Sequence, residues 1–395
     1  MSERDAEGER RSFAARVSLV FAALSVIIGT NLPYLPVWLD WVGLSSSDIA
    51  LITAMPLMVR VAVTPIIAFA ADRSGDHRKF LIGLAWTSLA GLLVLAQARE
   101  LGPILVWTMV FSLAWTTMLP LTEAVAMSGV KAAELDYGRM RLWGSLSFIA
   151  ASFAGGWVVA RLGAASAIWM VAAGAALTVA TTHGLGRPLA PRRRGAAPEP
   201  WRLSVVEAAR LLRQPGFLLF LTAAGLTQAS HAAFYTFGTL HWGALGLSTA
   251  WSGTLWAISI MAEVGLFAFS AAVLRRIGPA ELIVLGAGAA VIRWLIMGLD
   301  PAFYLLLPLQ ILHALTFGAA HIGAVHFIGR AVPETQAGMA QSLYAALTGG
   351  IATGGITLIA GPVYAAYAGR VYWAMALIAA AALLAGLALK AKSGG

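Results

Sequence analysis

Long apolar runs separated by short polar breaks follow one another along almost the whole chain. A bilayer core of roughly 30 Å is crossed by about 20 helical residues, and runs of that length recur throughout. Prolines inside the runs are tolerated in a helix bundle, where neighbouring helices satisfy the freed backbone groups, so we expect kinks there and not breaks. The pattern predicts an all-α membrane protein of twelve transmembrane helices, at residues 13–38, 47–70, 78–97, 102–126, 138–161, 164–185, 216–240, 249–273, 280–299, 302–328, 336–360 and 370–389.

The composition also indicates a membrane protein, and the positions of the charged residues indicate how the chain is oriented in the membrane. Of 395 residues, 59% are apolar and 11% charged, with a mean hydropathy of +0.79. The net charge of +9 would suit a nucleic-acid partner, but about 22 of the Lys and Arg residues lie in loops on one predicted side, and about 3 on the other. Because cationic loops stay in the cytoplasm, we expect a multi-pass protein of the bacterial inner membrane with both termini cytoplasmic and no nucleic-acid partner.

The chain divides into two halves. Residues 187–215 are rich in Arg and Pro and separate six predicted spans from six. Gly-Leu-Ser at 43–45 returns at 246–248, and Arg73-x-Gly75 returns as Arg276-x-Gly278, both at an offset of 203 residues. We therefore predict a cytoplasmic tail at 1–12, a six-helix bundle at 13–186, a cytoplasmic linker at 187–215 and a duplicated six-helix bundle at 216–390.

Ionisable residues inside the predicted spans are the informative ones. Each costs roughly 2.5 to 3.5 kcal/mol at membrane depth, so each must face a partner, a cavity or a helix end. Glu263 lies near mid-helix without a nearby Lys or Arg on its own helix, which favours a functional role. Arg141 lies near a helix start, where a positive anchor is an alternative to ligand contact. The set comprises Arg60, Glu123, Arg141, His231, Glu263, Arg293, His313 and His321.

The sequence shows no pattern that is typical of an enzyme active site. We find no Ser/His/Asp motif, no phosphate-binding glycine loop and no metal-ligand spacing, and the absence of cysteine excludes thiolate chemistry. We therefore expect no enzyme activity, no metal and no cofactor, with a proton gradient as the driving force. A membrane sensor that kept the fold but does not transport is the alternative of another class, although no appended soluble domain is present to carry its signal.

Several segments resemble a known family. They are NLPYLPVWLDWVGLSSSDIA, DRSGDHRK, YGRMRLWGS and LTQASHAAFY, and they are similar to the phenylpropionate permease family of the major facilitator superfamily. The resemblance covers nearly the whole chain and implies the major facilitator fold. It also implies that the loop containing Asp72, Arg73 and Gly75 acts as a gating loop, in which the acid caps and hinges helices.

A more distant resemblance to the bacterial galactoside/proton symporter implies residue roles. Its sugar-binding acid and arginine match Glu123 and Arg141, and its small residue and stacking aromatic match Ser145 and Phe148. Its helix 9 arginine and helix 10 histidine match Arg293 and His313, and its helix 8 acid corresponds approximately to Glu263. The pattern departs where Thr316 replaces the coupling glutamate and His231 replaces an aspartate. We therefore expect Glu263, His231, Arg293 and His313 to carry any proton coupling.

These expectations lead to a secondary transporter that imports a small organic solute by alternating access across the lipid bilayer, as a monomer. The family resemblance favours an aromatic carboxylate such as phenylpropionate, whose carboxylate Arg141 or Arg293 would meet. Phe148, Phe234 and Tyr235 would contact the ring, although simple packing is the alternative for each. Glu123 beside Arg141 would repel an anion and resembles a hydroxyl clamp, which leaves a proton symporter for a sugar or nucleoside as the rival.

Overall fold

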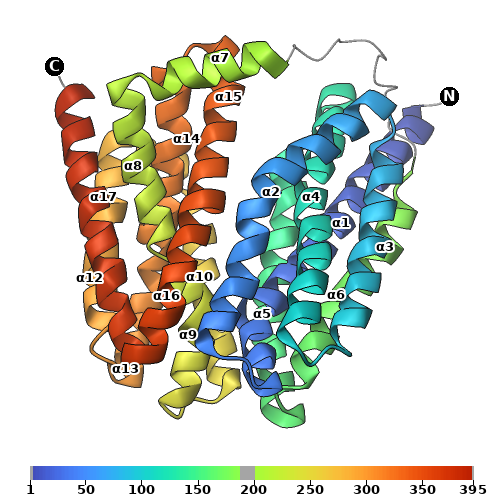
Figure 1. Ribbon diagram of the computed structural model, residues 1–395. Helices are drawn as coiled ribbons and strands as arrows, with labels where there is room; N and C mark the ends of the chain where they lie inside the picture. The colour runs from blue at the N-terminus through green and yellow to red at the C-terminus, as the bar shows by residue number, and fades with distance from the viewer. Residues whose placement is uncertain (1–2, 187–200, 394–395) are drawn as a thin grey trace. The chain divides into compact units, whose positions relative to one another are not determined.

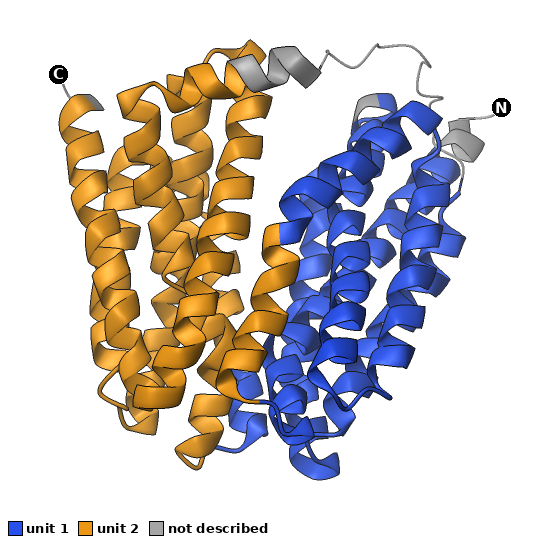
Figure 2. Cartoon of the chain, viewed as in Figure 1, with its two compact units in different colours: residues 1–44, 59–196, 247–257 blue, residues 45–58, 197–246, 258–395 orange. Residues whose placement is uncertain are grey.

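Residues 3–186 and 201–393 are described by the computed structural model, and every regular element among them is helical. They group into two compact units, coloured separately in Figure 2. Unit 1 comprises residues 1–44, 59–196 and 247–257, and unit 2 comprises residues 45–58, 197–246 and 258–395. Each unit therefore takes most of one predicted half and a short segment of the other.

Unit 1 is a bundle in which helix α1 packs against α4, α5 and α6, and α3 packs against α4 and α6. Its helices are visible in blue to green in Figure 1. The first helix begins ten residues earlier than predicted, so that most of the expected tail at 1–12 is helical. The elements are α1 (Glu3–Val42), the greater part of α2 (Ser46–Ser74), α3 (His77–Leu95), α4 (Leu101–Ala133), α5 (Tyr137–Leu162), α6 (Ser166–Gly184) and the start of α10 (Thr249–Ala268).

Unit 2 is built around α12, which packs against α17, α14 and α8. Helix α7 lies across one end of the unit and contacts α15 and α8 (Figure 1). The elements are the start of α2, α7 (Trp201–Leu212), α8 (Pro215–Ala229), α9 (Ala232–Ala244), the rest of α10, α11 (Ser270–Leu274), α12 (Pro279–Met297), α13 (Phe303–Ile311), the π-helix η1 (Ala314–Ala319), α14 (Ala320–Ala331), α15 (Glu334–Ala345), the π-helix η2 (Ala346–Ala352), α16 (Thr353–Tyr367), the 3₁₀ turn η3 (Ala368–Arg370) and α17 (Val371–Ser393).

The predicted linker at 187–215 is only partly accessible to comparison, because residues 187–200 lie outside the described part of the chain. Its remaining residues include helix α7, which sequence analysis did not anticipate. Apolar and polar positions in α7 follow the helical period, as expected for a helix that lies on a surface and does not cross the core.

Eleven helical stretches among the described residues are long and apolar enough to span a membrane. Ten of them correspond one to one with the first ten predicted spans, and the last, Glu334–Lys392, extends over 59 residues. That stretch covers both remaining predicted spans and is about 90 Å long if straight, far more than one bilayer crossing. Twelve spans and cytoplasmic termini remain predictions, and the eleven stretches agree with a chain that crosses the membrane several times.

The internal repeat reappears in the backbone at one of its two sites. Gly43 and Gly246, 203 residues apart, both have positive φ, at +99° and +89°. Each donates its N–H to the carbonyl three residues earlier, that of Asp40 or Gly243. A side chain would strain this left-handed conformation, which explains glycine at both helix ends. At the second site Gly75 has φ +71° whereas Gly278 has φ −71°, so the two turns differ there.

Candidate functional site

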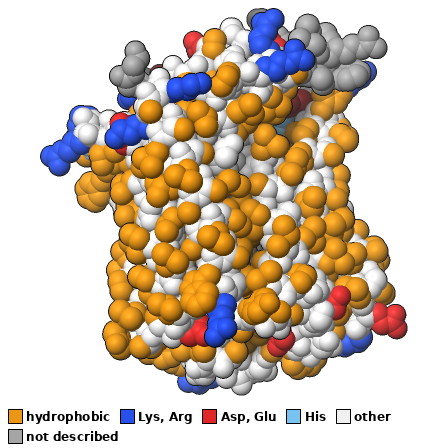
Figure 3. All heavy atoms as spheres, turned by 60° about the vertical axis from the view of Figure 1, so that its left-hand side comes forward, with side chains coloured by type: hydrophobic (Ala, Val, Ile, Leu, Met, Phe, Trp, Pro, Cys, Tyr) orange, Lys and Arg blue, Asp and Glu red, His pale blue; other side chains and the backbone are white. Residues whose placement is uncertain are grey.

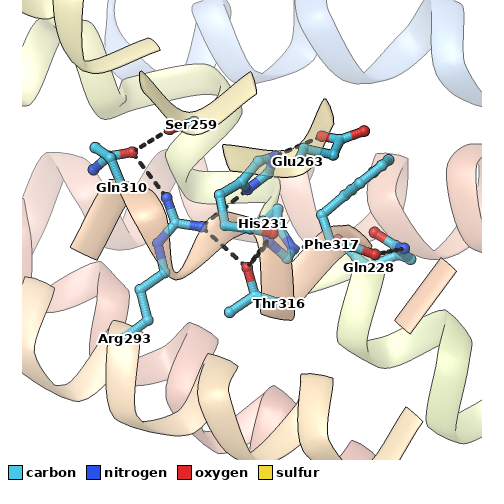
Figure 4. Close-up of polar contacts among 9 residues, drawn as sticks. Gln228, His231, Ser259, Glu263, Arg293, Gln310, Thr316 and Phe317 are labelled. Atoms are coloured by element: carbon cyan, nitrogen blue, oxygen red, sulfur yellow. Dashed lines mark hydrogen bonds and ion pairs between the residues drawn. The ribbon is translucent and has the colours of Figure 1, made fainter. Parts of the chain in front are cut away.

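A buried polar network occupies the interior of unit 2 (Figure 4). Arg293 contributes from α12 and Glu263 from α10, while His313 and Thr316 lie at and just after the start of η1. His231 stands between α8 and α9. Four of the predicted residues, Glu263, His231, Arg293 and His313, are therefore brought together in one network, although they come from four separate stretches of the chain.

The helix that was predicted to be continuous over 216–240 breaks at this network. Ser230 and His231 form a short turn between α8 and α9 that keeps right-handed helical φ and ψ, and both side chains bond to the structure around them. The Nδ1 of His231 lies 3.1 Å from the carbonyl oxygens of Thr227 and Gln228, and Ser230 accepts a hydrogen bond of 3.0 Å from the indole of Trp294. These contacts fix the break and turn the His231 ring into the bundle.

The π-helix η1 provides a second irregularity at the same depth. A wider turn at Ala314–Ala319 displaces the side chains that follow His313 from their ordinary α-helical register. His313, Phe317 and His321 then stack in a column, with ring centroids 5.4 and 6.0 Å apart. Short π-helical insertions recur at functional sites, which supports a functional role for this segment.

Arg293 is the centre of the network and is fully buried. Its Nη2 donates to Oε1 of Gln310 at 2.9 Å, and its Nη1 lies 3.2 Å from Oγ1 of Thr316 and 3.1 Å from Nδ1 of His313. The Gln310 oxygen also accepts from Ser259 at 2.8 Å. All these partners are neutral acceptors for Nη1 and Nη2, whereas the buried Nε of Arg293 has no hydrogen-bond partner among the described residues.

His313 bridges the cation and the acid. Its Nδ1 faces Arg293, which can only donate, so Nδ1 is the acceptor and Nε2 carries the proton. That Nε2 lies 3.5 Å from Oε2 of Glu263. A neutral imidazole with this tautomer therefore connects the guanidinium to the carboxylate.

His231 forms a second branch of the network. Because its Nδ1 faces two carbonyls, Nδ1 carries the proton and Nε2 accepts. Its Nε2 lies 3.0 Å from Oγ1 of Thr316, which in turn accepts from Arg293. Thr316, which the resemblance matches to the coupling glutamate of the galactoside symporter, links Arg293 to His231 without a charge.

Aromatic rings enclose the guanidinium. The Cζ of Arg293 lies 4.8 Å from the ring centre of Phe234 and 4.7 Å from that of Trp294. Phe234 is fully buried in this contact, so it packs against Arg293 in this structure and does not present an open face to a ligand. Tyr235 is partly exposed and stacks on His231 at 5.5 Å, which leaves it as the better candidate for ligand contact.

A smaller cluster lies in unit 1. Glu123 on α4 accepts a hydrogen bond from the Tyr137 hydroxyl at 3.5 Å, and Arg141 lies one helical turn after Tyr137 on α5. The Arg141 Cζ is 5.5 Å from the ring centre of Phe21, and the edge of Tyr137 meets the same ring at 6.3 Å. Glu123, Tyr137 and Arg141 are all partly exposed, so their polar groups are available to a ligand.

The other predicted residues of unit 1 are less closely associated with this cluster. Ser145 lies one turn beyond Arg141 on α5 and is partly exposed. Phe148 is 8% exposed, and its backbone packs against Gly29 of α1, so packing accounts for its position. In the predicted gating loop, Oδ1 of Asp72 lies 2.9 Å from Nε2 of His77, a hydrogen bond that joins the end of α2 to the start of α3.

The backbone of that loop turns at Gly75. Gly75 has φ +71°, which favours glycine, and its N–H donates to the carbonyls of Ala71 and Asp72. Arg73 is exposed in the last turn of α2. The loop is therefore a compact connection between two helices, and its gating role remains a prediction.

Sequence analysis missed several members of both clusters. Tyr137 was present in the YGRMRLWGS segment, and Gln228 in LTQASHAAFY, but neither was given a role. Gln310 lies three residues before His313, in an otherwise apolar run, and an amide at that depth is a detectable signal. Ser259 carried no such signal, because short hydroxyl side chains also bond to their own helix backbone.

Known proteins resemble the chain in sequence and in structure. The model of the MFS_1 like family matches residues 15–375. A protein of Escherichia coli strain K12 named probable 3-phenylpropionic acid transporter is 32% identical over 361 residues, covering 90% of this chain and 92% of that protein. The maltose permease of Geobacillus stearothermophilus is 27% identical, covering 87% and 86%.

Among solved structures, the crystal structure of the nucleoside transporter NupG has a TM-score of 0.81 at 18% identity, covering 96% of this chain and 98% of that one. At that identity the likeness shows the fold alone. Together with the family match and the relatives, it identifies a multi-pass membrane transporter and not an enzyme. The chain belongs to the MFS_1 like family of the major facilitator superfamily.

Proposed function

We propose that this transporter imports an aromatic carboxylate, such as 3-phenylpropionate, together with a proton. It does so as a monomer with twelve spans and cytoplasmic termini, by alternating access around a midplane site. The observation that carries the proposal is the chain of contacts within unit 2 from the partly buried Glu263 through the buried His313 to the buried Arg293. A carboxyl group connected to a cation through a neutral imidazole is an arrangement that can gain and lose a proton.

Charge balance in this network links the proton to an anion. With Glu263 ionised and Arg293 charged, the buried network is neutral overall. Protonation of Glu263 leaves the Arg293 charge uncompensated in a low-dielectric interior, where an unpaired charge is costly. A substrate carboxylate then restores neutrality, so proton and anion bind cooperatively in a ratio of one to one.

In this proposal the residues that contact the substrate directly are partly exposed ones. Arg293 is fully enclosed and acts through its charge, whereas Arg141 is partly exposed and can meet a carboxylate with its guanidinium. Tyr235 offers a partly exposed ring next to His231 for the aromatic part of the substrate. The 32% identity to the protein named probable 3-phenylpropionic acid transporter supports this class of substrate.

A sugar or nucleoside symporter is the second candidate, because of the unit 1 cluster. Glu123 is an acceptor, Arg141 a donor, and Tyr137 can serve as either. A set of this kind suits neutral hydroxyl groups, and Glu123 opposes an anion. The relative named maltose permease supports a carbohydrate as the alternative.

Uptake into proteoliposomes tests the proposal. The purified protein is given labelled 3-phenylpropionate, maltose or uridine under an imposed inward proton gradient, with and without a protonophore. We expect accumulation of the aromatic acid that collapses with the protonophore. Accumulation of the sugar or nucleoside instead would select the second candidate, and downhill flux that ignores the gradient would contradict proton coupling.

A further inference from the structure

A cavity of about 450 Å³ opens at one end of unit 2 and has no part in the network described above. It lies where the start of α12 meets the ends of α14 and α17. Its polar lining consists of Glu281, Arg330 and Lys390, and Phe327 supplies an aromatic wall. These three charged side chains come from three different helices, so the fold assembles them at one point.

The cavity carries a net positive charge. Lys390 Nζ lies 3.8 Å from Glu281 Oε1, a loose ion pair whose side chains are 52% and 41% exposed. Arg330 is exposed and adds a second cation without a second acid in the lining. Helix α12 begins at Pro279, within the lining, so its positive end reinforces the two cations. An anion is therefore the ligand that this charge distribution favours.

An apolar face lies directly along the same helices. Leu285 follows Glu281 by one turn on α12, and Leu387 and Leu384 precede Lys390 on α17. These three leucines are 41%, 47% and 69% exposed, and α12 and α17 pack along each other. Figure 3 shows Lys and Arg side chains gathered at one end of a broad hydrophobic surface. A ligand that fits both features has an anionic head and an apolar tail.

The corresponding position of unit 1 provides an internal comparison. Residues 75–78 line a cavity there, and residues 278–281, at the repeat offset of 203, line the cavity of unit 2. The unit 1 cavity has a volume of only about 50 Å³, one ninth of the other. Both halves thus form a cavity at the repeat-related position, and of these two only that of unit 2 has room for more than a water-sized group.

We propose that the unit 2 cavity binds the headgroup of an anionic phospholipid. The phosphodiester lies between Arg330 and Lys390, and the acyl chains follow the leucines of α12 and α17. Glu281 opposes this anion and competes for Lys390. The site is separate from solute transport and does not depend on which substrate is carried.

Lipid titration of the full-length protein in detergent tests the site. The probes are phosphatidylglycerol, phosphatidylethanolamine and phosphatidylcholine, followed by native mass spectrometry of the bound lipid. A basic residue near a membrane surface contributes about 1 kcal/mol, or roughly fivefold in affinity, so we expect the double variant R330Q/K390Q to weaken phosphatidylglycerol binding about 25-fold. The variant E281Q should strengthen it by up to about fivefold, an effect that misfolding would not produce.

The matched control is R276Q/K392Q, which removes two exposed cations of unit 2 that do not line the cavity. Unchanged binding in this control supports a defined site, and an equal loss would show a diffuse charge effect and overturn the proposal. Preference for phosphatidylethanolamine, with weaker binding in E281Q, would overturn the anionic assignment. Full competition by free glycerol phosphate at the lipid's own concentration would identify a soluble anion as the ligand and overturn the lipid assignment.

Discussion

The two polar clusters differ in burial and in the length of their hydrogen bonds. In unit 2, Arg293 is fully buried and donates to three neutral acceptors within 3.2 Å. In unit 1, Glu123 and Arg141 are partly exposed, and the recorded hydrogen bond between side chains there, from Tyr137 to Glu123, is 3.5 Å long. A buried network held by several short hydrogen bonds resists a new ligand, whereas a more exposed and loosely bonded cluster accepts one.

This difference suggests that the two clusters have different roles in transport. The unit 1 cluster has donors and acceptors to offer a solute, and the unit 2 network has a carboxyl group whose proton changes the charge of a buried site. If the two roles are separate in this way, variants of the unit 2 network uncouple transport from the proton, and variants of the unit 1 cluster change the affinity for the solute.

The largest effect is expected for Glu263→Gln. The amide cannot exchange a proton, so uphill accumulation should fall to the downhill level while exchange of internal for external substrate continues. Labelled uptake and counterflow in proteoliposomes measure the two properties separately. The matched control is Glu281→Gln, which removes an acid of unit 2 outside the network; undiminished accumulation by the Glu263 variant would remove Glu263 from coupling.

Arg293→Met should be the most destabilising change of the series. It leaves Gln310, Thr316 and His313 without their common donor and removes the guanidinium charge from the network. Breaking a buried charged network of this kind costs about 3 to 5 kcal/mol. Thermal unfolding in detergent measures the loss, with the exposed Arg275→Met as the control; equal stability of the two variants would show that Arg293 is not the centre of the network.

Arg141→Ala should weaken substrate binding without a matching loss of folded protein. A hydrogen bond to a charged group contributes about 1.5 to 3 kcal/mol, so affinity should fall roughly 10- to 100-fold. Equilibrium binding to the purified transporter provides the measurement. Arg139→Ala removes a cation two residues away at the same helix start, and if both variants bind normally Arg141 is only a topological anchor.

The smallest effect is expected for Tyr137→Phe. Its hydrogen bond to Glu123 is long, so the loss of the hydroxyl should cost less than about 1 kcal/mol and change affinity less than about fivefold. Complete loss of binding would place Tyr137 in direct contact with the solute. Competition assays with an aromatic acid and with a sugar would show which of the two loses affinity.

The hydrophobic pattern was sufficient to place the membrane helices, because lipid exposure imposes a long apolar run on each. It did not reveal the break at Ser230 and His231, which lies inside an apolar run without proline. Nor did it reveal the π-helices η1 and η2, since one extra residue in a turn leaves hydrophobicity unchanged. Irregular backbone of this kind is fixed by side-chain hydrogen bonds to other helices, and not by local propensity.

The candidate site was predictable in its charged members only. A charge at membrane depth is costly enough to stand out, and Glu263, Arg293 and His313 were found in this way. The contacts among them could not be predicted. His313 meets Glu263 and Arg293, which lie 50 and 20 positions away in the sequence, and these contacts depend on how α10, α12 and η1 pack. Phe234 shows the opposite case, where a residue expected to bind substrate is enclosed against Arg293.

The most direct test of the account is the response of aromatic-acid uptake to membrane potential. Proteoliposomes with a potassium diffusion potential set by valinomycin, and separately with a pH gradient, provide the two driving forces. One proton with one carboxylate carries no net charge, so the account predicts 3-phenylpropionate uptake that follows the pH gradient and is unchanged by the potential. Uptake driven by the potential alone, as for a proton with a neutral solute, would contradict it.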